Sequence, residues 1–97
     1  MLATLQLDQL LPLVGDSFSL ATEQGSVHAE LIQAKACSQA MKGSDREPFS
    51  LLFRLAPGVQ LPQRMYPTVH HDWDLGNVFL VPVQPDAQGN RMEAIFN

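Results

Sequence analysis

The chain has 97 residues, of which 45% are hydrophobic and 16% are charged, and its formal net charge at pH 7 is −4. This length fits a single domain spanning residues 1–97, and the composition is typical of a folded globular protein. The basic residues are scattered singly along an acidic chain, which argues against nucleic-acid binding and against docking on an acidic membrane surface.

The N-terminal segment predicts one short helix and no targeting signal. Residues 4–11 have Thr4 as a capping residue and Pro12 as the point where regular helix ends, and their apolar stripe consists of Leu7, Leu10 and Leu11. The segment lacks the basic start and the long apolar run of a secretory signal or a membrane span. Cys37 is the single cysteine and cannot form an internal disulfide, so we expect a soluble cytoplasmic protein.

From residue 17 onward the hydrophobic period changes from that of a helix to that of strands. Residues 17–22 and 27–36 are predicted as two strands joined by a tight turn. In the second strand the apolar alternation changes phase at Leu31–Ile32, which predicts a bulge or a sharp bend. Residues 37–47 are polar and are predicted as a loop.

Four further strands are predicted in the second half of the chain. Residues 48–56 give the clearest alternation, and 76–85 and 91–97 follow the same pattern. Residues 63–71 contain Pro67, which indicates an edge position or a bulge. About six strands within residues 17–97 therefore predict a mainly β fold: a small antiparallel meander that closes into a barrel or a two-sheet sandwich, with one short N-terminal helix.

Two of these strands are apolar on both faces. A lone small barrel needs one apolar face per strand, and the short helix can cover a part of the other face. We therefore expect self-association or a protein partner, bound at a surface made of Leu52, Phe79, Val81 and Val83. The predicted core consists of Phe18, Leu20, Leu31, Phe49, Leu51, Phe53, Leu80, Val81 and Phe96.

The stretch "VHHDWDLG" has the densest group of side chains that could carry chemistry. On a strand, His70 and His71 point to opposite faces and cannot both bind one metal ion unless a turn separates them. His71 and Asp74 could converge in a turn, but a catalytic zinc ion needs three protein ligands. We interpret the stretch as a strand-to-strand turn in which Asp72 or Asp74 accepts backbone N–H bonds and Trp73 packs on the rim.

Other catalytic patterns are missing from the sequence. No serine lies in a nucleophile-elbow context, and no glycine-rich phosphate loop is present. We predict no catalytic residue, no metal and no cofactor. A metal-dependent enzyme centred on the histidine stretch is a remote alternative, and a small-molecule carrier whose ligand rim consists of Tyr66, His70 and Trp73 is a closer one.

Two acidic residues in or beside apolar strands suggest internal ion pairs. Glu47 and Glu93 are each predicted to pair with Arg54 or Arg64 and so to fix the register of neighbouring strands.

Four stretches carry a resemblance to a known family. They are "EPFSLLF", "LPQ" followed by Tyr66, "LG" followed by "FLVPV", and the terminal "EAIFN". The sequence resembles a small bacterial domain family that carries an unknown-function label, although the N-terminal third matches in pattern alone and "HHDWD" replaces a shorter loop. The resemblance implies no catalytic residue and no cofactor. It also implies genes placed near phage tail-collar-like proteins.

The sequence thus predicts a non-enzymatic module for protein interaction or assembly. The resemblance adds that this module is an accessory part of a phage tail-like or fibre-type system.

Overall fold

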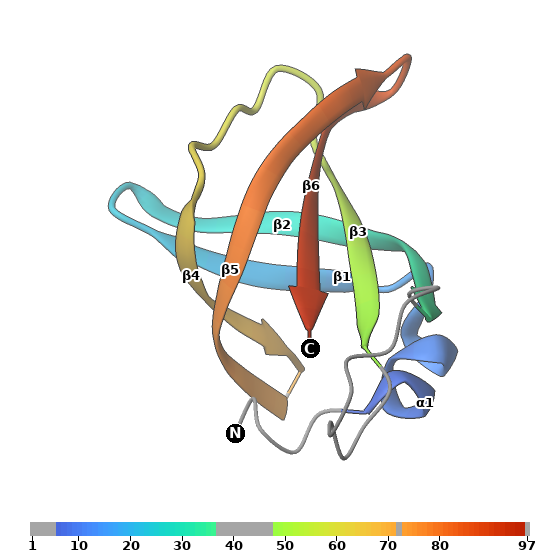
Figure 1. Ribbon diagram of the computed structural model, residues 1–97. Helices are drawn as coiled ribbons and strands as arrows, with labels where there is room; N and C mark the ends of the chain where they lie inside the picture. The colour runs from blue at the N-terminus through green and yellow to red at the C-terminus, as the bar shows by residue number, and fades with distance from the viewer. Residues whose placement is uncertain (1–5, 37–47, 72, 97) are drawn as a thin grey trace.

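Six antiparallel strands close into a barrel over the residues that the structure, a computed structural model, describes: 6–36, 48–71 and 73–96 (Figure 1). The elements are α1 (Leu7–Leu10), the 3-10 turn η2 (Leu11–Leu13), β1 (Ser17–Thr22), β2 (Gly25–Ala36), β3 (Phe49–Leu55), β4 (Arg64–His70), β5 (Trp73–Asp86) and β6 (Gly89–Phe96). Around the barrel the order is β1-β2-β3-β6-β5-β4, and β4 pairs with β1. The predicted mainly β fold with a short N-terminal helix is confirmed. Of the two predicted forms, a barrel or a two-sheet sandwich, the structure is the closed barrel.

One connection departs from a simple meander. β3 pairs with β6 and not with β4, so residues 56–63 carry the chain across one end of the barrel. Figure 1 shows β1 and β2 running behind the other strands at a steep angle to them, with α1 beside the end of β2. The β3–β6–β5 strands therefore present a broad outer surface on the side opposite β1 and β2.

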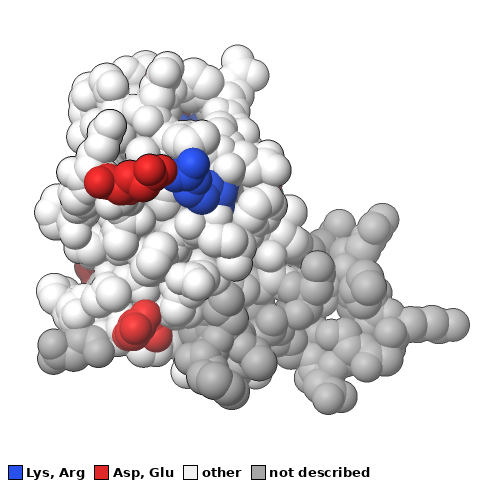
Figure 2. Space-filling view, turned by 90° about the vertical axis from the view of Figure 1, so that its left-hand side faces the viewer, with Lys and Arg blue, Asp and Glu red and all other residues white. Residues whose placement is uncertain are grey.

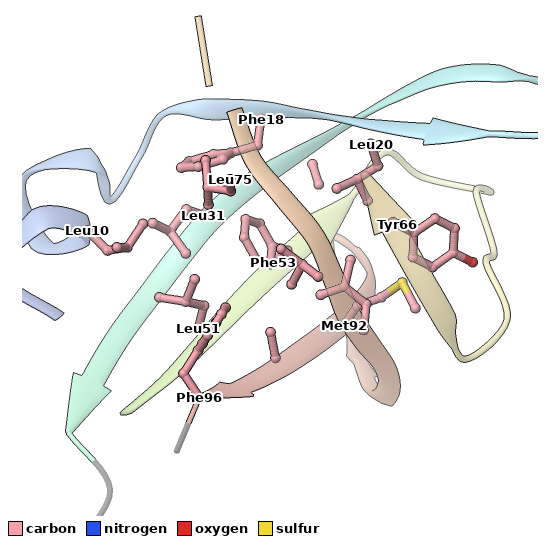
Figure 3. Packing of buried hydrophobic residues seen from close by; sticks show 14 of the residues in the cluster. Leu10, Phe18, Leu20, Leu31, Leu51, Phe53, Tyr66, Leu75, Met92 and Phe96 are labelled. Atoms are coloured by element: carbon pink, nitrogen blue, oxygen red, sulfur yellow. The ribbon is translucent and has the colours of Figure 1, made fainter. Parts of the chain in front are cut away.

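The core is built from the inward side chains of all the strands (Figure 3). The rings of Phe18 and Phe53 meet edge-on with centroids 5.4 Å apart, and those of Phe49 and Phe96 stack at 4.9 Å. The predicted core residues that are buried are Phe18, Leu20, Leu31, Phe49, Leu51, Phe53, Leu80 and Phe96. The prediction for Val81 is wrong, because side chains alternate along a strand and the inward position belongs to Leu80.

The N-terminal helix is shorter than predicted. α1 ends at Leu10, which is fully buried and lies beside Leu31 in Figure 3. Pro12 lies within the 3-10 turn η2, and this turn leaves Leu11 exposed and not on the predicted apolar stripe. Thr4, the predicted cap, lies outside the described residues. Within the described ranges, no helix has the length and apolar character needed to cross a membrane.

The predicted irregularity in β2 is confirmed. The pairing between β2 and β3 shifts register between Leu31 and Gln33, which leaves Ile32 as the extra residue of a bulge. After the bulge, Ala34 lies opposite Leu51, so the apolar side of the strand continues to face the interior. The polar loop predicted at residues 37–47 lies outside the described residues.

Pro67 lies where β4 has a partner on one side. It is opposite Asn77 of β5, while the pairing of β4 with β1 is confined to Thr68 and Val69 in the described strands. A register shift follows directly between Thr68 and Val69. Because proline has no N–H to donate, it is tolerated at this position without loss of a ladder hydrogen bond to β1.

Candidate functional site

The outer side of β3, β6, β5 and β4 carries several large apolar side chains that are not part of the core. Phe79 is 47% exposed, its cross-strand partner Met65 is 48% exposed, and Ile95 of β6 is 59% exposed. The predicted partner residues Leu52, Val81 and Val83 also point outward and are half-buried. We call the set of Leu52, Met65, Phe79, Val81, Val83 and Ile95 the outer apolar face.

The strand register places a carboxylate within this face. Glu93 of β6 lies between Leu52 of β3 on one side and Val81 of β5 on the other. Two residues further along β6, Ile95 points to the same side as Glu93. The half-buried carboxylate is thus bordered by apolar side chains in two directions across the sheet and in one direction along β6, and Arg91 is its neighbour in the other direction along β6.

The predicted ion pairs of Glu93 are wrong. Arg54 instead pairs with Asp86, its Nε lying 3.1 Å from Oδ2, and has Glu30 at 4.0 Å. Arg64 pairs with Glu23 at the β1–β2 turn. No ion pair or hydrogen bond joins the Glu93 carboxylate to another residue in the described part of the chain. Glu47 lies outside that part.

The Arg54–Asp86 pair joins β3 to the end of β5 across β6. Opposite Arg54 on β6 is Arg91, a like charge, and Asp86 offsets that repulsion. Arg91 donates from Nε to the Gln84 carbonyl oxygen at 2.8 Å. The hydrogen bonds from Arg54 hold the pKa of the Asp86 carboxyl below its ordinary value.

This lowered pKa predicts an acid-sensitive contribution to stability. Since the folded-state pKa of Asp86 is below the value of about 3.9 in an unfolded chain, the contribution is complete above that value. It is lost as pH falls through the lower folded-state pKa. The difference in urea midpoint between wild type and Asp86→Asn should therefore be constant from about pH 7 to about pH 5 and shrink below about pH 4.

The control is Asp8→Asn, which changes an exposed carboxylate on α1 that has no ion pair among the described residues. Because it removes the same charge without removing an ion pair, its urea midpoint measures the effect of net charge alone. A wild-type-minus-Asp86→Asn difference that stays constant down to about pH 2 would contradict the assigned role of the Arg54 pair.

The two histidines of the "HHDWD" stretch lie at the β4–β5 hairpin, at the opposite end of the barrel from residues 56–63. His70 is 9% exposed, and its Nε2 is 2.9 Å from Oδ2 of Asp16, the residue before β1. The His70 ring also packs on Phe18, with centroids 4.8 Å apart, and on His71 at 4.5 Å. His70 is therefore held by its own chain on three sides.

The other described residues of that stretch lie at the hairpin itself, and Asp72 lies outside the described residues. His71 adopts a positive φ of 52°, and Trp73 pairs with His70 and packs against the core. The Asp74 carboxylate accepts a hydrogen bond from the Gly76 N–H at 2.8 Å, as predicted for a turn. Among the described residues, no group of three or more histidine, cysteine or acidic side chains is placed to hold a metal ion.

The three residues of the predicted ligand rim do not line one opening. Trp73 and His70 are neighbours at the hairpin. Tyr66 is buried near the start of β4, at the other end of the strand, and its hydroxyl donates to the Pro62 carbonyl oxygen at 2.6 Å. Burial raises the pKa of that hydroxyl. A cavity of about 260 Å³ lies near the residue 56–63 connection, with walls that include Leu55, Leu61, Pro82 and Met92.

Comparison with known protein families shows the family of the chain. A family described as "Domain of unknown function (DUF6916)" matches residues 5–96. The chain belongs to the DUF6916 family. No match was found among curated proteins or among solved structures. The predicted membership of an unknown-function domain family is therefore confirmed.

Two members of the outer apolar face of this DUF6916 domain were missed in the sequence. Met65 follows Arg64 at the start of a strand interrupted by Pro67, so its face could not be assigned from a run of alternating residues. Ile95 can be assigned to the outer face from the sequence, because it shares a strand face with Glu93 and alternates with the buried Ala94 and Phe96. Alternation along β6 therefore places Ile95 on the outer face, whereas Met65 is placed there by the pairing of β4 with β5.

Proposed function

We propose that this DUF6916 domain is a non-enzymatic interaction or assembly module that binds a protein through its outer apolar face. The observation that carries the proposal is the exposure of Met65, Phe79 and Ile95 on neighbouring strands. The barrel interior is filled by other residues, so these three contribute little to the core. Soluble monomers seldom expose contiguous apolar patches without a binding role.

The energetics favour docking of a complementary surface. Completing the burial of one large apolar side chain that is already half-buried contributes about 1 kcal/mol, and the face offers several such side chains. Charged side chains border one end of the face, since Arg91 is opposite Val83 and Arg54 is opposite Arg91. On the side of the molecule in Figure 2, where β4 and the β1–β2 hairpin tip lie, uncharged residues cover most of the described surface. Protein interfaces commonly combine an apolar centre with a polar and charged rim.

A role in a phage tail-like or fibre-type assembly is the finer form of the proposal. It draws on the resemblance of the "EPFSLLF", "FLVPV" and "EAIFN" strands to the small bacterial family whose genes lie near tail-collar-like proteins. The same strands, β3, β5 and β6, supply most of the outer apolar face.

The test compares wild type with Phe79→Asp and with Ser26→Asp, which adds the same charge at an exposed position of β2 on the β1–β2 hairpin. Each protein is analysed by size exclusion with light scattering and used to capture binders from a lysate of its host cell. Any captured protein is purified and titrated. We expect one complex that Phe79→Asp weakens at least about thirtyfold, the loss typical of an interface hot spot, and that Ser26→Asp leaves unchanged.

Phe79→Asp should remain folded, because an exposed substitution away from the core usually changes stability by less than about 0.5 kcal/mol. The proposal fails if no oligomer and no purified complex depends on residue 79. It also fails if Phe79→Asp unfolds the domain, since Phe79 would then be part of the core.

Small-ligand carriage is a second candidate, and the cavity of about 260 Å³ beside Leu61 and Met92 is the observation that favours it. Its volume suits a ligand smaller than most drug-sized molecules. The absence of any NMR contact between small apolar probes and the Met92 methyl group would remove this candidate.

A further inference from the structure

We infer that the partner of the outer apolar face is a basic protein surface, in which apolar side chains surround an arginine or lysine that pairs with Glu93. This inference rests on the proposed function and specifies its partner. It begins from the position of Glu93 between Leu52 and Val81, with Ile95 two residues along the same strand.

Docking on this face would bury the Glu93 carboxylate further. A carboxylate that loses water without gaining a partner destabilises a complex strongly, whereas one that meets a guanidinium or ammonium group forms a charge-assisted hydrogen bond. An apolar partner with no cation would therefore bind less tightly than one that supplies a cation. The carboxylate makes the face selective for a partner that supplies positive charge.

The chain does not supply that charge from its own described arginines. Arg54 is held by Asp86, Arg64 by Glu23, and Arg91 donates to the backbone at Gln84 while lying near Asp86. Arg91 lies two residues from Glu93 on the same side of β6, but within residues 6–36, 48–71 and 73–96 no ion pair joins Glu93 to a cation.

Charge also argues against a second copy as the partner. A twofold contact centred on Glu93 would place two carboxylates opposite each other, and each chain carries a formal net charge of −4. A second copy could offer Lys35, which is in register with Ser50 and Ile95, but Lys35 lies on β2, two strands away from β6. It could also offer Arg91, but that guanidinium group already donates to the Gln84 carbonyl oxygen and lies near Asp86. The net negative charge of the chain instead accelerates encounter with a basic protein.

The test uses defined peptides and no unidentified ligand. The probes are blocked pentapeptides with leucine and phenylalanine on each side of a central residue, which is arginine, its neutral isostere citrulline, or glutamate. Binding is followed by ¹⁵N NMR on wild type, Glu93→Gln and Phe79→Asp. Amide shifts centred on residues 79, 81, 93 and 95 would place the peptide on the outer apolar face.

We expect wild type to bind the arginine peptide about three- to fivefold more tightly than the citrulline peptide, the range of a solvent-exposed ion pair, and the glutamate peptide most weakly. Glu93→Gln should abolish this preference and keep binding to the citrulline peptide. Raising NaCl from 0.05 M to 0.5 M should weaken binding of the arginine peptide alone.

The outcomes separate the inference from the proposed function. Equal affinity for the three peptides, or a preference that survives in Glu93→Gln, overturns the basic partner and leaves the apolar face intact. Loss of every peptide in Phe79→Asp supports the face, and its failure to affect any peptide counts against both. A wild-type dimer that dissociates in both Glu93→Gln and Lys35→Gln would make a second copy the partner and overturn the inference.

Discussion

Phe53→Ala is expected to destabilise the folded domain by about 3–5 kcal/mol, measured as the free energy of unfolding in urea. Phe53 is fully buried in β3 and its ring meets Phe18 edge-on, so removing it leaves a cavity at the centre of the barrel. The surrounding strands are joined in a closed ladder and cannot collapse freely into that space. A loss of this size is a large fraction of the total stability of a small domain.

The matched control is Phe79→Ala, the same substitution at a half-exposed position on the outer face. It should cost less than about 1 kcal/mol, because the Phe79 side chain already contacts water. Similar losses for the two variants would mean that Phe79 contributes to the core, which would contradict the division between interior and outer face.

Gly89→Ala is expected to cost about 2–4 kcal/mol for a different reason, namely a steric clash with the backbone. Gly89 begins β6 with φ at +151°, a conformation that residues with a Cβ rarely adopt. A Cβ at this position would lie 2.6 Å from the Leu55 carbonyl oxygen. Relief of the clash requires movement of the β3 or β6 backbone, since no flexible side chain is involved.

Gly25→Ala separates the two contributions. Gly25 also has a positive φ, at +113°, but a Cβ there would meet no atom within 4 Å. We expect it to cost about 1–2 kcal/mol from backbone strain alone. Thermal unfolding of both variants measures the difference, and equal losses would show that contact with Leu55 adds nothing.

The sequence predicts local features of this fold better than its closure. The phase change at Leu31–Ile32 identifies a bulge because the shift from one apolar face to the other is visible in neighbouring residues. The crossing of β3 to β6 is not visible in this way, because residues 56–63 can return to either neighbour. The inward choice between Leu80 and Val81 is similarly open in a strand that is apolar on both faces.

The candidate site is likewise predictable from the sequence only in part. Phe79 is identified as a surface residue because the strand around it has more apolar residues than one face can use. The isolation of Glu93 is not predictable, since it depends on Arg54 and Arg64 having other partners, Asp86 and Glu23, that are 32 and 41 residues away along the chain.

The contact between His70 and Asp16 joins β4 to the start of β1, the pair of strands that separates most easily. β1 and β4 pair through Ser19 with Val69 and Leu20 with Thr68, the shortest ladder among the described strands, so separation there breaks the fewest backbone hydrogen bonds. A barrel opened between β1 and β4 would expose two unpaired strand edges, and such edges can pair with strands of another chain. His70 of β4 contacts the Asp16 carboxylate beside β1 and the Phe18 ring of β1. These contacts hold β1 and β4 together and so oppose the opening of the closed barrel into an open sheet.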